Sequence, residues 1–122
     1  MRQLVFFLLL IFAVTNATAV SKGDIQKKIS ALESKAGLTK KDFILLGDLE
    51  IQVQEYEKAI EFYKKANKPQ SVEVLDKLAE AYHLKKDNLE EIRALELIRV
   101  DNKISPNQLV RLGNAYDTIN KT

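Results

Sequence analysis

Over most of this chain the apolar residues recur three and four positions apart, which is the spacing of one face of an α-helix. Three positions carry a helix-capping pattern, in which a side-chain oxygen precedes an acid or glutamine by three residues: Thr39 with Asp42, Asp87 with Glu90, and Ser105 with Gln108. The pattern predicts six helices, at about residues 24–36, 40–53, 55–67, 71–86, 88–100 and 106–120. Because the connections are short, neighbouring helices are expected to run antiparallel. The predicted fold class is therefore all-α.

The first 19 residues have a different pattern. Arg2 precedes an unbroken apolar run of eleven residues from Leu4 to Val14, and Ala17-Thr18-Ala19 supplies the small residues that signal peptidase accepts. We expect a signal peptide over 1–19, cleaved after Ala19, and one helical domain over 20–122. A membrane-spanning helix needs about 20 apolar residues, so we expect membrane contact only if the leader stays uncleaved. The chain is expected to be exported, and its lack of cysteine favours a bacterial periplasm or cell exterior.

Small residues occupy matching places in three of the predicted helices. Gly47, Ala79 and Gly113 are separated by 32 and 34 residues. Large apolar residues accompany each of them at helical spacing: Phe43 and Leu46, then Leu75, Leu78 and Tyr82, then Leu109, Leu112 and Tyr116. A small residue lets a neighbouring helix approach closely, so the intervals predict a repeated helix-packing unit.

The chain resembles the tetratricopeptide repeat (TPR) family, whose period is about 34 residues. The resemblance rests on Leu112-Gly113-Asn114-Ala115-Tyr116 and on the segment from Gly47 to Ala66, which matches at small, aromatic and alanine positions. It implies an antiparallel helix-hairpin solenoid of about three repeats, with a half repeat at each end. The chain departs from the family pattern at Pro69, which comes two residues before the usual proline position, and at two acids. Glu50 stands where the family prefers a large apolar residue, and Glu91 stands where it prefers alanine.

The half repeats leave two interpretations of the chain ends open. Ile25, Ile29 and Leu32 lie one period before Ala59, Tyr63 and Ala66, so the first helix is of the second type and lacks its partner. The last helix, with Gly113 and Tyr116, is of the first type. In one interpretation it simply covers the preceding hairpin. In the other, Ile25, Ile29 and Leu32 of one copy dock onto Gly113 and Tyr116 of the next, and head-to-tail stacking gives a ring or filament.

The family resemblance also implies a partner-binding groove. First-type helices of such repeats line a concave face that holds an extended or helical peptide. By register, the predicted groove residues are Ile44, Asp48, Ile51, Glu73, Asp76, Glu80, His83, Leu84, Val110, Asn114 and Asp117. Acids dominate this set, so a basic partner protein or peptide is expected. The alternative is that these charges form an ordinary solvated surface.

Other functions find little support in the sequence. With 19 Lys and Arg against 17 Asp and Glu, the chain is near neutral, and acids interrupt its lysine pairs, so nucleic-acid binding is not expected. His83 is the only histidine and there is no cysteine. No glycine-rich phosphate loop or metal-binding motif occurs. We therefore expect no catalytic residues, metal or cofactor, and a noncovalent binding module rather than an enzyme.

Overall fold

The computed structural model describes residues 20–121, which form six helices and no strand. The helices are α2 (Lys22–Glu33), α3 (Lys40–Gln52), α4 (Tyr56–Ala66), α5 (Val72–Lys85), α6 (Asn88–Val100) and α7 (Pro106–Asn120). The prediction of an all-α chain is confirmed. The predicted signal peptide lies outside the described residues. Within residues 20–121, no helix has the length and apolar character needed to cross a membrane.

Side-chain caps fix where most of these helices begin. Thr39 and Ser105 each take part in a capping box, with Asp42 and Gln108 respectively, and the Asp87 side chain accepts from the backbone N–H of Glu90. These caps satisfy amides that the first turn of a helix leaves unpaired. The three predicted helix starts are therefore confirmed.

The first described helix differs from its prediction at both ends. It begins at Lys22 rather than near residue 24, because the Ser21 side chain accepts from the backbone N–H of Asp24 at 3.1 Å. It ends at Glu33, three residues before the predicted end at Ala36. The Ser34 hydroxyl donates to the Ala31 carbonyl at 2.8 Å, and Gly37 then adopts a φ of 68°. This left-handed conformation suits glycine and turns the chain toward α3.

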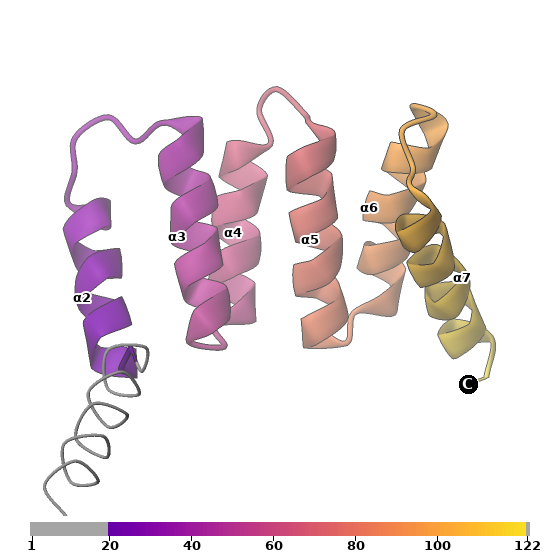
Figure 1. Cartoon of the computed structure of the whole chain (residues 1–122), viewed down its shortest axis with the longest axis horizontal. Coiled ribbons are helices and arrows are strands. Elements are labelled where there is room, and N and C mark those ends of the chain that lie inside the picture. The colour runs from indigo at the N-terminus through magenta and orange to yellow at the C-terminus, as the bar shows by residue number, and fades with distance from the viewer. Residues whose placement is uncertain (1–19, 122) are drawn as a thin grey trace, which may run out of the picture.

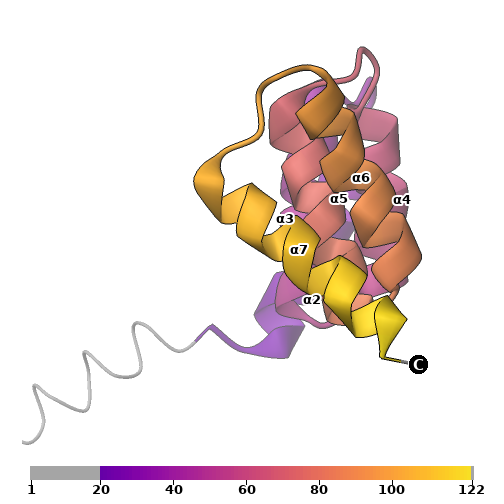
Figure 2. The same ribbon diagram turned by 90° about the vertical axis from the view of Figure 1, so that its right-hand side faces the viewer.

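The helices stand side by side in chain order, and each packs against the one before and the one after it (Figure 1). The most extensive contacts join α3 to α4 and α5 to α6, and the least extensive join α2 to α3. Viewed along the row, α3 and α5 lie on one side and α4 and α6 on the other (Figure 2). The four central helices thus alternate between two layers, and α7 crosses the end of the row obliquely (Figure 2).

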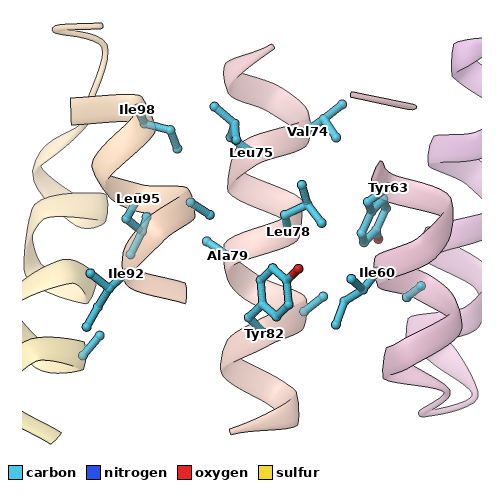
Figure 3. Close-up of a cluster of buried hydrophobic side chains, with 14 of the residues drawn as sticks. Ile60, Tyr63, Val74, Leu75, Leu78, Ala79, Tyr82, Ile92, Leu95 and Ile98 are labelled. Carbon is cyan, nitrogen blue, oxygen red and sulfur yellow. The ribbon is translucent and has the colours of Figure 1, made fainter. Parts of the chain in front are cut away.

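The apolar core consists of two clusters of different size. The larger cluster is built mainly by α4, α5 and α6 and includes Leu112 and Ala115 of α7. Figure 3 shows α5 at its centre, with Leu75 and Ala79 toward α6 and Val74 and Leu78 toward α4. The smaller cluster joins α2 to α3 and contains Ile25, Ile29, Leu46, Leu49 and Val53. Phe43 packs against both clusters and so connects them.

The three small residues on which the predicted repeat rests have unlike surroundings. Gly47 and Ala79 are buried, whereas Gly113 is exposed. A Cβ atom at Gly47 would lie 2.6 Å from Cδ1 and 2.8 Å from Cζ of Tyr63, while a Cβ at Gly113 would meet nothing within 4 Å. The close helix approach expected at all three positions is thus present at Gly47, Ala79 is buried in the core, and at Gly113 the expectation is wrong, because no neighbouring helix covers it within the described residues.

Two carboxylates are buried in the described part of the chain, on Glu50 and Glu91. The Oε2 atom of Glu50 has no hydrogen-bond partner among residues 20–121. Burial raises the pKa of Glu50, the positive charge of Lys58 opposes this rise, and the negative charges of Glu33 and Glu55 add to it. The ionised Glu50 side chain therefore destabilises the fold at neutral pH.

Gly47 and Gly113 provide a matched test of helix packing. We expect Gly47→Ala to lower the free energy of unfolding by about 2 kcal/mol, because the Tyr63 ring is buried and has little room to move. We expect Gly113→Ala to raise it by about 0.5 to 1 kcal/mol, because alanine is the better helix former and the added methyl meets open space. Urea unfolding followed by circular dichroism measures both changes, and equal effects of the two variants would contradict the packing described.

Replacing the buried Glu50 should change the stability of the fold in a pH-dependent way. Because the folded state holds the Glu50 proton to higher pH than the unfolded state, stability falls as pH rises from the ordinary pKa of 4.5 through the raised value. Glu50→Gln should therefore be more stable than the natural chain by about 1 kcal/mol at pH 7, and the gain should shrink as the pH approaches 4.5. Thermal unfolding at several pH values measures this, with Glu61→Gln as an exposed control on α4. A gain in stability that is independent of pH would contradict a raised pKa for Glu50.

Candidate functional site: a groove along α3, α5 and α7

Three adjoining hollows are lined mainly by residues of α3, α5 and α7. The N-terminal hollow has a volume of about 500 Å³ and is lined by Lys40, Lys41, Ile44, Leu45, Asp48 and Glu73. The central hollow has a volume of about 220 Å³ and is lined by Asp48, Ile51, Tyr63, Lys77, Glu80 and Ala81. The C-terminal hollow has a volume of about 480 Å³ and is lined by Glu80, His83, Asn88, Glu91, Arg111, Asn114, Ala115 and Thr118. Asp48 belongs to the first two and Glu80 to the last two, so the hollows adjoin one another, and together they are called the groove.

Most of the predicted groove residues line these hollows. They are Ile44, Asp48, Ile51, Glu73, Glu80, His83 and Asn114. Asp76, Leu84, Val110 and Asp117 lie outside the three hollows. Leu84 and Val110 are exposed, and Asp117 forms an ion pair with Lys121 on its own helix at 3.1 Å.

Asp48, in the central hollow, already has partners from other helices of the same chain. The Asp48 Oδ1 atom accepts from Lys77 Nζ at 2.9 Å and from the Tyr63 hydroxyl at 2.5 Å. Burial and the hydrogen bond to Asp48 both raise the pKa of Tyr63, so its hydroxyl stays protonated and donates. These contacts join α3, α4 and α5, and leave Asp48 less negative charge to offer a partner.

A second acid, Asp76, ties α7 to α5. Its Oδ1 atom lies 2.7 Å from Arg111 Nη1 and 2.9 Å from Gln108 Nε2. Both Asp76 and Arg111 are about one third exposed, so the pair is partly shielded from solvent. The predicted acidic groove therefore needs a correction. Of its five acids, only Glu73 and Glu80 have no ion pair within residues 20–121.

Sequence reasoning missed the cations because they reach the acids from other helices. Asp48 and Lys77 are 29 residues apart, and Asp76 and Arg111 are 35 residues apart. These separations differ from each other and from the intervals of 32 and 34 residues between the small residues, so the repeat register alone does not identify either pair.

Glu91 is a further lining residue that the predicted groove omitted, because it belongs to α6. Its side chain is 2% exposed and lies 3.3 Å from the Nδ1 atom of His83. His83 itself is 68% exposed. Among residues 20–121, no three His, Cys, Asp or Glu side chains lie close enough together to hold a metal ion.

The residues predicted to join copies end to end are placed in two different ways. Ile25 and Ile29 are buried against α3, and Leu32 is half-buried beside them. A second copy would reach these three side chains only if α2 moved. By contrast, Gly113 is open and Tyr116 is 40% exposed, with its hydroxyl donating to Glu96 at 3.1 Å.

Tyr116 also borders an apolar hollow between α6 and α7, which sequence reasoning did not identify. It has a volume of about 480 Å³, and its lining is Ile92, Arg93, Glu96, Leu97, Val100 and Tyr116. Leu97 and Val100 are 46% and 74% exposed. The end of the row therefore presents apolar surface next to the open position at Gly113.

Comparison with known proteins gives no relative with which to compare this groove. No protein-family model matches the chain, and no curated protein has a significantly similar sequence.

Proposed function

We propose that the chain is an exported TPR-type solenoid that binds a segment of another protein in the groove along α3, α5 and α7. The observation that carries this proposal is the row of three adjoining hollows, whose linings come mainly from α3, α5 and α7. A row of hollows of this kind accommodates an extended or helical segment. Export follows from the leader pattern in residues 1–19.

The lining of the groove supports noncovalent recognition. Ile44 and Ile51 are half-buried and offer apolar contact, while Glu73 and Glu80 offer negative charge without an ion pair in the described chain. Apolar anchors supply affinity, and charges select the partner and steer its approach. A partner segment with basic and apolar residues fits this lining.

Charge reversal in the groove tests the proposal. We expect Glu73→Lys together with Glu80→Lys to reduce partner capture by at least about tenfold, because both acids face the hollows without a cation of their own. Capture is measured with a photo-crosslinking residue at Asn114 in the envelope of cells that make the protein. The control places the same crosslinker at Glu61, which is exposed on α4.

Products that form equally from both crosslinking positions, or that survive the charge reversal, would contradict groove binding. Glu73 and Glu80 are preferable to Asp76 for this test, because reversing Asp76 would also break its contacts with Arg111 and Gln108.

The exposed end of α7 favours a second function, self-assembly into a ring or filament. Gly113 has nothing within 4 Å of its missing side chain, and the equivalent Gly47 is covered by an aromatic ring of the next helix. A helix from a second copy would cover Gly113 in the same manner. This contact would use the exposed face of α7 rather than the buried side chains of Ile25 and Ile29.

Light scattering on the chain from Val20 onward tests self-assembly. We expect the average molar mass of the particles to increase with protein concentration. We expect Gly113→Leu to keep the chain monomeric by filling the open position. Gly23→Ala, at an exposed glycine near the start of α2, is the matched control. A chain that stays monomeric at all concentrations up to millimolar would exclude stacking.

A further inference from the structure

The C-terminal and central hollows are built from matching positions of successive helices. Asp48, Lys77 and Ala81 line the central hollow, and Glu80, Arg111 and Ala115 line the C-terminal hollow at positions 32 or 34 residues later. Each hollow therefore has one acid, one cation and one alanine in corresponding places. This correspondence allows the charges of the two hollows to be compared directly.

In the described part of the chain, the acid at this matching position is paired when it is Asp48 and unpaired when it is Glu80. Asp48 receives Lys77 Nζ and the Tyr63 hydroxyl. The residue 32 positions after Tyr63 is Leu95, which has no hydroxyl to donate.

Arg111, the cation that corresponds to Lys77, is paired with a different acid. Arg111 forms its ion pair with Asp76 at 2.7 Å instead of turning to Glu80. Glu80 consequently has neither an ion pair nor a side-chain hydrogen bond within residues 20–121, although it lies at the junction of both hollows.

Glu91 adds a second carboxylate to the same hollow. The residue 32 positions earlier is Ala59, which is fully buried in the neighbouring hairpin, so Glu91 replaces a small apolar side chain. Its contact with His83 is 3.3 Å long, and a carboxylate that is 2% exposed loses much of its hydration. A cation entering the hollow would restore a strong partner to this group.

We propose that the C-terminal hollow is a subsite for an arginine side chain of the bound segment. Glu80 and Glu91 supply two carboxylates, and Asn88, Asn114 and Thr118 supply further acceptor oxygens around them. A guanidinium group has five N–H donors in one plane, which suits several acceptors better than the compact ammonium of lysine. The volume of about 480 Å³ accommodates the whole side chain. This inference rests on the proposed function and adds the chemistry of one partner residue.

Binding of a blocked peptide tests the subsite directly. The probe is acetyl-Gly-Arg-Gly-amide, titrated into ¹⁵N-labelled chain from Val20 onward, which contains every described helix. We expect chemical-shift changes to centre on the backbone amides near Glu80, Glu91 and Asn114. The analogue with citrulline, which has nearly the same shape but no charge, should bind at least about tenfold more weakly. The lysine analogue should also bind more weakly than the arginine peptide.

Three variants separate the subsite from a general effect of charge. Glu80→Gln and Glu91→Gln should each weaken binding of the arginine peptide by at least about tenfold. Glu73→Gln, an unpaired acid of the N-terminal hollow, should leave binding unchanged. Glu80 is exposed, so its variant keeps the fold and remains informative even if Glu91→Gln does not.

Equal binding of the citrulline peptide, equal or tighter binding of the lysine peptide, or unchanged binding by Glu80→Gln would each overturn the arginine subsite. Groove crosslinking with a failed arginine titration would refute the subsite and leave the proposed function standing. Binding of the arginine peptide without any groove crosslinking would refute the proposed function instead.

Discussion

The approach of α4 to the backbone of α3 at Gly47 is the contact on which the groove depends. Because residue 47 has no Cβ, the Tyr63 ring lies against the helix backbone and is buried there. From this position the Tyr63 hydroxyl reaches Asp48, and Asp48 in turn holds Lys77 of α5. One missing methyl group thus allows three helices to be joined around the central hollow. The same hydroxyl donates a hydrogen bond to the Asp48 carboxylate that lines that hollow.

The two buried acids show how a regular packing scheme is modified locally. Glu50 and Glu91 stand where the resemblance predicts apolar or small residues, and both are nevertheless enclosed by the fold. Their surroundings differ. Glu50 leaves an oxygen atom without a partner and borders none of the three hollows described, whereas Glu91 lines a hollow on the groove face. Burial raises the pKa of Glu50, whereas Glu91 contacts His83 and lines the hollow in which a bound cation would pair with it.

Local features of the fold could be predicted from the sequence, and long-range features of the site could not. Thr39 and Ser105 marked helix starts because capping depends on residues three positions apart. Ser21 was missed, so the first helix was placed too late. The pairs of Asp48 with Lys77 and of Asp76 with Arg111 depend on the side-chain directions of different helices, which periodicity does not determine. Gly47 and Gly113 look alike in sequence, yet only the position of the neighbouring helix decides which one is covered.

The division of the core into two clusters makes the ends of the row unequal in strength. α2 is held by the smaller cluster, through Ile25 and Ile29, and Phe43 provides the link to the remaining helices. Local opening in proteins begins where few apolar contacts must be broken. α2 is therefore the segment that can detach while the groove persists, and its backbone amides should exchange with heavy water before those of α5.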